Sequence, residues 1–177
     1  NIDELNNKYN INSKDLEVYL PIEQKLLDKS NMEIHYLGYY LKWIPQEAYY
    51  YASEHCNFKA RPFRSQGTYG KYQSIDDKID DLHWYTTYIK FGIGRTTYDA
   101  SQEIRNNHIT RDEAKLLVKK FDGEFPDRYF NEIIEYLDIE EEDFFSWIDD
   151  FRSEHLWNKV DNEWTLRHTV NFDGFND

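Results

Sequence analysis

The sequence predicts a mainly α-helical fold with one or two short strands. Apolar residues recur at helical spacing from residue 74 onward, helix-start signals precede them, and glycines follow them. The chain has 177 residues, including 15 Tyr, 11 Phe and 5 Trp. Because aromatic side chains bury large areas, a chain of this length and composition can form a hydrophobic core.

The first third of the chain contains the expected strand. Residues 1–33 are polar and Asn-rich, with a short helical pattern from Pro21 to Leu27. The run 33–43 is rich in strand-forming residues, and its first half is expected to be a strand. Pro45 then opens an expected helix, because proline favours the first helical turn.

Consecutive helices are expected after residue 74. Their start signals, in chain order, are Ser74 with Asp77, Thr96 with Asp99, a capping box from Thr110 to Glu113, Pro126 and Asp138. Gly92 and Gly123 are expected to end two of these helices. The tail 159–177 adds a short strand or packs loosely.

Composition excludes several classes of function. The net charge of −13 disfavours a nucleic-acid partner, and it also argues against a helix-turn-helix at residues 104–110. The sequence contains no run of about 20 apolar residues and no secretory signal pattern. The lone Cys56 forms neither an internal disulfide nor a zinc pair. A cytoplasmic location is expected, and the non-Met start at Asn1 indicates a piece of a longer chain.

Residues 57–75 carry a net positive charge, whereas the chain as a whole is negative. This segment has no Asp or Glu and contains four basic residues, which are Lys59, Arg61, Arg64 and Lys71. It is either a solvated loop or a loop that meets an anionic ligand.

The segment 88–99 is the richest in residues that could bind a ligand. A helix is expected to end at Gly92, and a second helix begins with Thr96 and Thr97. Free backbone N–H groups at a helix start bind anions, and Lys90 and Arg95 would add positive charge. The sequence therefore predicts a phosphate or carboxylate site here.

Other candidate sites are weaker. Asp80 and Asp81 are interpreted as a solvated face in a first helical turn, while a magnesium role stays open for Asp76 and Asp77. No metal-ligand spacing is found among the histidines. His83 is either an acid–base group or, more commonly for a histidine, a packed one.

Three stretches of the chain resemble the C-terminal half of the N-acetyl sugar amidotransferases. They are residues 37–43, 89–105 (with Lys-Phe-Gly-Ile-Gly-Arg at 90–95) and 109–126. The resemblance implies that the strands complete an upstream Rossmann-like PP-loop α/β domain. On this basis, residues 1–56 end that domain and 57–177 form a helical C-terminal domain.

The resemblance also implies a reaction. An acetamido group of an N-acetyl amino sugar, or of its nucleotide derivative, becomes an acetamidino group. ATP with Mg²⁺ adenylylates the amide oxygen, and ammonia from a partner glutaminase displaces AMP. The products enter lipopolysaccharide O-antigens or the nonulosonic acids that decorate flagellin. The family's ATP loop is missing from these residues, so the chain alone is expected to be inactive.

The resemblance also implies site residues, most of them in the same matching motifs; Thr68, Tyr69, Ser74 and Asp77 lie outside those motifs, in the stretch that would line the sugar pocket. Lys90 and Arg95 are the expected catalytic residues, because preorganised cations stabilise charge that develops on phosphate. The expected substrate-binding residues are Thr68, Tyr69, Ser74, Asp77, Thr96, Asp99, Arg105 and Arg111. For Asp99 the sequence favours a helix cap over a binding role, and Arg105 and Arg111 are equally structural residues that tie two short helices together through carboxylates. A non-catalytic helical interaction module and a different PP-loop amidating enzyme are the alternatives.

Overall fold

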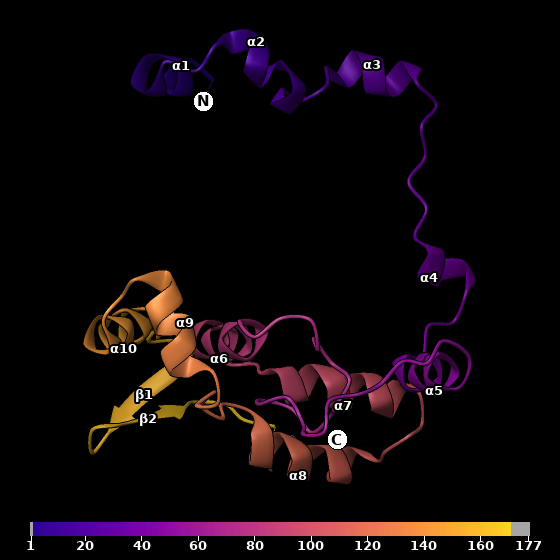
Figure 1. Ribbon diagram of the computed structural model, residues 1–177, viewed down its shortest axis with the longest axis vertical. Helices are drawn as coiled ribbons and strands as arrows, with labels where there is room; N and C mark the ends of the chain where they lie inside the picture. Colours follow the sequence, from indigo (N-terminus) through magenta and orange to yellow (C-terminus); the bar gives the residue numbers. More distant parts are fainter. Residues whose placement is uncertain (1, 171–177) are drawn as a thin grey trace. The chain divides into compact units, whose positions relative to one another are not determined.

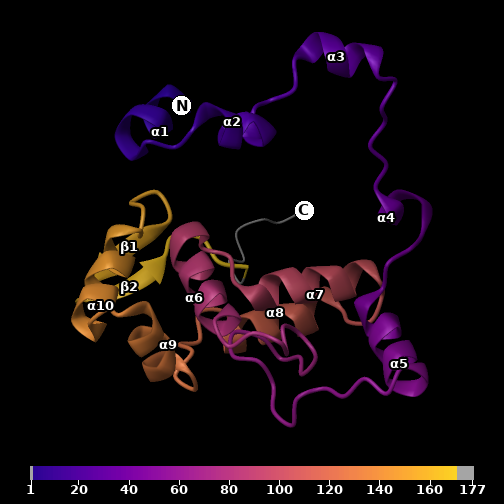
Figure 2. The same ribbon diagram turned by 45° about the horizontal axis from the view of Figure 1, so that its top comes forward.

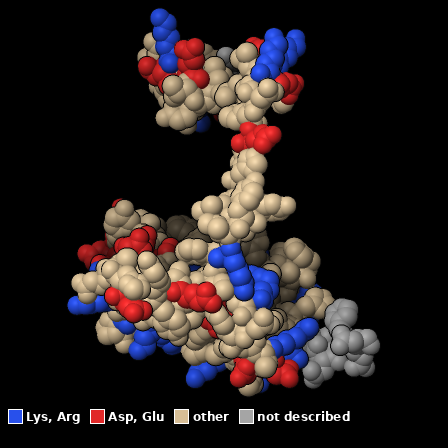
Figure 3. All heavy atoms as spheres, turned by 90° about the vertical axis from the view of Figure 1, so that its right-hand side faces the viewer, with Lys and Arg blue, Asp and Glu red and all other residues tan. Residues whose placement is uncertain are grey.

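The computed structural model describes residues 2–170 (Figure 1). The chain divides into two compact units, Asn1–Trp43 and Ile44–Asp177. The described residues form ten α-helices, one 3-10 turn and one two-stranded hairpin, which confirms the mainly helical fold. None of these helices is long and apolar enough to span a membrane. Acidic and basic side chains are interspersed on the face in Figure 3.

The first unit consists of short helical pieces. They are α1 (Ile2–Tyr9), α2 (Ser13–Leu16), η1 (Glu17–Tyr19), α3 (Gln24–Lys29) and α4 (Leu37–Tyr40). The prediction of a strand at the start of 33–43 is wrong, because residues 33–36 have no regular structure and α4 follows them. β-propensity takes effect only where a neighbouring strand supplies pairing, and no described segment pairs with these exposed residues.

The second unit contains the longer helices. They are α5 (Pro45–His55), α6 (Asp80–Phe91), α7 (Arg95–Arg105), α8 (Arg111–Phe121), α9 (Phe130–Leu137) and α10 (Glu141–Asp150). Three signals are confirmed: Pro45 occupies the first turn of α5, Gly92 ends α6 with a left-handed φ of 69°, and Thr110 forms the capping box of α8.

Other helix boundaries differ from expectation. Helix α6 starts only at Asp80, because the Asp77 carboxylate accepts a hydrogen bond from the Ile79 N–H at 2.7 Å and forms a turn first. Residues 127–129 also form a turn, so α9 starts four residues after Pro126. Asp138 ends α9 in a left-handed conformation and does not begin α10.

A hairpin follows α10. Strands β1 (Trp157–Val160) and β2 (Glu163–Leu166) pair antiparallel, with Val160 opposite Glu163. The two turn residues, Asp161 and Asn162, both have positive φ, as a tight two-residue hairpin requires. Part of the expected tail strand is thereby confirmed, while residues 171–177 lie outside the described part.

The core of the second unit lies between α6, α9 and α10. Its buried members are Leu82, Ile89, Phe130, Ile133, Phe144 and Ile148. The hairpin joins this core through Trp157, whose indole N–H donates to the Ile89 carbonyl at 2.7 Å. Helices α7 and α8 pack side by side next to α6 (Figure 2), and they carry most of the candidate site.

Candidate functional site

Arg95, the first residue of α7, is held in one orientation by three neighbours. Its Nε donates to the Asp99 carboxylate at 2.9 Å, and its guanidinium lies 4.8 Å from the Trp84 ring centre and 5.3 Å from that of Tyr98. The terminal nitrogens make no hydrogen bond to a described residue, and about a quarter (26%) of the side chain is exposed. Arg95 therefore presents a fixed, planar fork of donors.

Asp99 ties this arginine to the loop that precedes α6. Its second carboxylate oxygen accepts from the Thr68 hydroxyl at 2.6 Å. Burial raises the pKa of Asp99 above its usual range, and the charge of Arg95 offsets only part of that rise. Thr96, the residue after Arg95 in the chain, is fully buried, and its hydroxyl donates a hydrogen bond to the Gly67 carbonyl at 2.7 Å. Thr68, Thr96 and Asp99 thus fasten the loop to α7.

Two tyrosines and one glutamate extend this cluster. Burial raises the pKa of Tyr72 to about 12 and raises that of Tyr69 further, and the negative charges of Glu103 and Asp99 add to both shifts. Both phenols therefore stay protonated at neutral pH. The Tyr72 ring stacks on Tyr49 with centroids 4.5 Å apart.

The start of α7 is not an open anion site, contrary to the expectation. The Asp122 carboxylate accepts hydrogen bonds from the N–H groups of Gly94 and Thr97, both at 3.2 Å, and from the Thr97 hydroxyl. Burial raises the pKa of Asp122, and these donors counteract part of the rise. A side chain of the protein thus already caps the helix end where a phosphate was expected.

Lys90 and Arg95 lie in different surroundings. Lys90 is exposed near the end of α6, with its Nζ 5.5 Å and 5.7 Å from the ring centres of Phe91 and Phe151. It lines an apolar cavity of about 410 Å³ whose other residues come from α6, from α10 (including Phe144 and Trp147) and from Phe151, which follows α10. The two expected catalytic cations therefore serve different surfaces.

Two arginines of the basic segment 57–75 bind other groups of the protein. Arg64 forms a two-pronged ion pair with Glu124, and Arg61 donates to the carbonyls of Ser74 and Asp77 at 2.6 and 3.0 Å. Although burial acts to raise the pKa of Glu124, its hydrogen bonds from Arg64 and from the Gly67 N–H hold that pKa below its usual range. Both arginines therefore hold the fold together.

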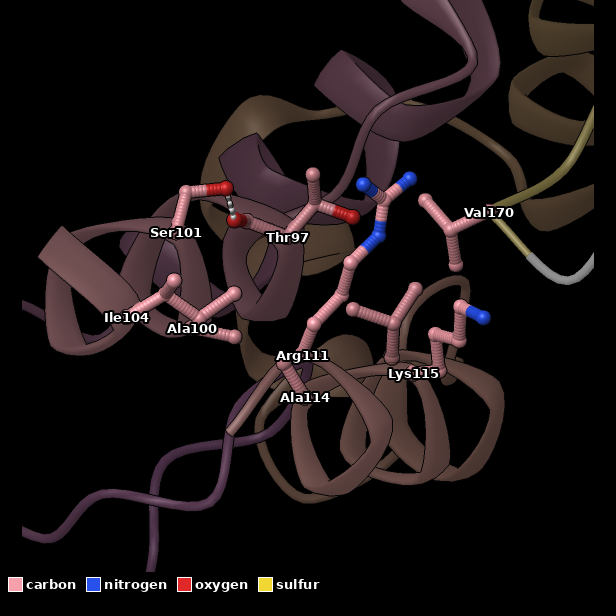
Figure 4. Close-up of a pocket in the computed structure, with 9 residues that line it drawn as sticks. Thr97, Ala100, Ser101, Ile104, Arg111, Ala114, Lys115 and Val170 are labelled. Carbon is pink, nitrogen blue, oxygen red and sulfur yellow. Dashed lines mark hydrogen bonds between the residues drawn. The ribbon is translucent and has the colours of Figure 1, made fainter. Parts of the chain in front are cut away.

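The remaining expected residues occupy separate places. Ser74 adopts a left-handed φ of 44°, and the carboxylate of Asp77 forms the turn before α6. Arg105 is exposed at the end of α7. Arg111 lines a cavity between α7 and α8 (Figure 4).

Sequence reasoning missed several structural partners. Asp122 was not singled out, although the Asp-Gly pair at 122–123 is a signal for a side chain that makes local or capping bonds. The solvated-face interpretation is wrong for Asp81, which is buried and accepts from the Gln66 N–H at 3.3 Å. Trp84 carried no signal, because nothing local reveals that an arginine will lie over its ring.

Comparison with known proteins identifies the class. The fold is a helical domain in which α7 starts with an arginine fixed by Asp99, Trp84 and Tyr98. The model of the family "LPS biosynthesis protein WbpG-like, C-terminal domain" matches residues 66–171, which is more than half of the chain, so the chain belongs to that family. None of the curated proteins matches it.

Proposed function

We propose that the chain is the C-terminal part of an ATP-dependent N-acetyl sugar amidotransferase and that Arg95 binds the anionic part of its sugar substrate. The family match supports a role in lipopolysaccharide biosynthesis. The observation that carries the binding role is the guanidinium of Arg95, fixed by Trp84, Tyr98 and Asp99 with its terminal nitrogens open. A planar arginine fork matches phosphate and carboxylate geometry.

In the proposed reaction, ATP activates the acetamido oxygen and ammonia from a glutaminase partner replaces it. The residues described here do not form a preformed metal site. No group of three His, Cys, Asp or Glu side chains within 2–170 is placed to hold a metal ion, and Asp122 occupies the start of α7. We therefore assign substrate binding to this chain and leave ATP phosphate chemistry outside it.

Binding at Arg95 benefits from pre-organisation. The side chain loses little conformational freedom on binding, because the flanking rings and Asp99 already fix it. Tyr98 is 57% exposed beside it and offers a flat face to a sugar ring or a base.

The test uses the enzyme that contains this chain, with an acetamido sugar nucleotide, ATP and ammonia, and it measures AMP release. Arg95→Ala should raise the KM for the sugar at least about tenfold, because one charge-assisted contact is lost, and Arg95→Lys should recover part of it. Lys90→Ala should lower kcat if Lys90 has the catalytic role expected from the sequence. Lys120→Ala, an exposed change of equal charge on α8, is the control.

An interaction module without catalysis is the second candidate. The exposed aromatics Phe91, Trp147 and Phe151 around the apolar cavity favour it. If the wild-type enzyme released no AMP with any acetamido sugar, the amidotransferase proposal would fail. If Arg95→Ala and Lys90→Ala folded normally and left AMP release unchanged, the binding role of Arg95 would fail and this chain would be a module without a catalytic part.

A further inference from the structure

Two adjoining apolar hollows lie at the end of α6. The first is the cavity of about 410 Å³ between α6 and α10. The second measures about 520 Å³ and is bordered by the end of α6 and by residues between 150 and 156. Lys90, Phe91 and Phe151 line both hollows, which therefore form one continuous groove, the α6–α10 groove.

Three large aromatic side chains on this groove are exposed. Phe91 and Phe151 are each 57% exposed, and Trp147 is 48% exposed. All three border the first hollow. Exposed apolar residues are ordinary where they are scattered singly, whereas several that border one hollow form a patch, and such a patch is typical of a binding surface.

The threonines of the groove use their hydroxyl hydrogens within α6. Thr86 and Thr87 both donate to the His83 carbonyl, at 3.0 and 2.7 Å. They therefore have no donor left for a ligand, and the floor of the groove favours an apolar group.

The edge of the groove carries negative charge. Asp150 lines the second hollow, and Asp143 and Asp150 lie four residues before and three residues after Trp147 on α10. This spacing places both carboxylates on the Trp147 side of the helix. Neither carboxylate makes an ion pair or a hydrogen bond with a described residue. The Lys90 ammonium already lies over the rings of Phe91 and Phe151.

We propose that the α6–α10 groove binds an amphipathic helix with basic flanks that belongs to a partner protein. Apolar side chains from successive turns of that helix enter the two hollows, because residues three and four apart share one face of a helix. Its lysines or arginines pair with Asp143 and Asp150. This interaction does not depend on the reaction proposed above.

Charge favours this occupant over a second copy of the chain or a lipid surface. A second copy would bring the same net charge of −13 and the same carboxylates, so the two copies would repel each other. A bilayer with anionic lipids would be repelled for the same reason. A basic helix is attracted, and Trp147 is its expected anchor, because tryptophan is enriched among the residues that dominate binding energy.

The test uses a fluorescein-labelled synthetic helix of about 18 residues, with leucines on one face and lysines on the other. Its fluorescence anisotropy is followed as the protein is added. The wild type should bind the peptide, and Trp147→Ala should weaken binding at least about tenfold. The double variant Asp143→Asn with Asp150→Asn should weaken it about threefold, because two exposed ion pairs are lost. Tyr136→Ala, at a 76% exposed aromatic residue of α9, is the matched control and should bind like the wild type.

Two further peptides separate apolar contact from charge. A scrambled peptide of the same composition keeps the charge and loses the apolar face. A peptide with glutamate in place of lysine keeps the apolar face and reverses the charge. Both should bind more weakly than the first peptide. Phe151→Ala gives a second measurement at the same groove if Trp147→Ala lowers the melting temperature.

Several outcomes would overturn the proposal. They are no binding of the leucine–lysine helix, equal binding of the scrambled peptide, and equal affinity of Trp147→Ala and Tyr136→Ala at unchanged melting temperatures. A dimer in sedimentation equilibrium that Trp147→Ala dissociates would assign the groove to a second copy instead. Binding of anionic vesicles that Trp147→Ala abolishes would assign it to a membrane. AMP release tests the proposed function separately, so a failure here leaves that proposal intact.

Discussion

At the scale of single residues, buried carboxylates organise the candidate site. Asp99 orients Arg95, and Asp122 occupies the start of α7. Each accepts several hydrogen bonds, which offset the cost of removing a charge from water. Because Asp122 occupies the N–H groups of the helix start, the terminal nitrogens of Arg95 are the donors here that make no hydrogen bond to a described residue.

Glu103 gives a pH-dependent prediction. Burial raises its pKa above the ordinary 4.5, and the neighbouring Tyr69 hydroxyl and His108 offset only part of that rise. The folded state therefore holds this proton more tightly than the unfolded state. Relative to Glu103→Gln, the wild type should be most stable in acid and should lose stability as the pH rises from about 4.5 to the folded pKa.

Urea unfolding of both proteins across this pH range measures the effect. The exposed Glu135→Gln change is the matched control. A stability difference between wild type and Glu103→Gln that rises with pH would contradict the buried environment assigned to Glu103.

At the scale of elements, two faces of α7 make different contacts. One face carries Arg95 and Asp99 against Trp84 and the loop before α6. The other carries Thr97 and Ser101 toward α8. A helix places residues three and four apart on one face, which is why these two sets separate cleanly.

The turn after α8 gives a prediction at this scale. Gly123 has a left-handed φ of 77°, and a Cβ there would collide with the ring of Tyr88. Gly123→Ala should therefore cost about 1–3 kcal/mol of unfolding free energy. Gly38→Ala in α4 is the control, since nothing lies within 4 Å of its added Cβ. Equal denaturation midpoints for the two variants would contradict the close approach to Tyr88.

At the scale of the whole molecule, the two units differ in burial. Leu16 is the buried hydrophobic residue of the first unit within the described part, whereas the second unit holds the core cluster. Tyr36 and Tyr39 are 79% and 87% exposed. The second unit should therefore hold most of the folding energy.

Limited trypsin digestion tests this difference. Cleavage should occur first within residues 1–43, at Lys25, Lys29 or Lys42, because local opening is easiest where little is buried. The remaining fragment should keep its thermal unfolding transition. Earlier cleavage within α6 or α8 would show that the second unit is not the more stable one.

Local sequence signals predicted much of the helical framework. The capping box at Thr110, proline at Pro45 and the left-handed Gly92 act within about four residues, so their effect is visible in the sequence. The strand expected before Trp43 failed because strand formation needs a distant partner. The family resemblance rested on motif residues and agrees with the matched family at the level of lipopolysaccharide biosynthesis.

The sequence by itself determined a mainly helical protein and named Arg95, Asp99 and Arg111 as candidates. Only the tertiary structure decided that Asp122 caps α7, that Lys90 and Arg95 face different surroundings, and that Arg111 borders a cavity. The reason is physical: helix signals depend on neighbours along the chain, whereas a binding site depends on side chains that meet across separate elements.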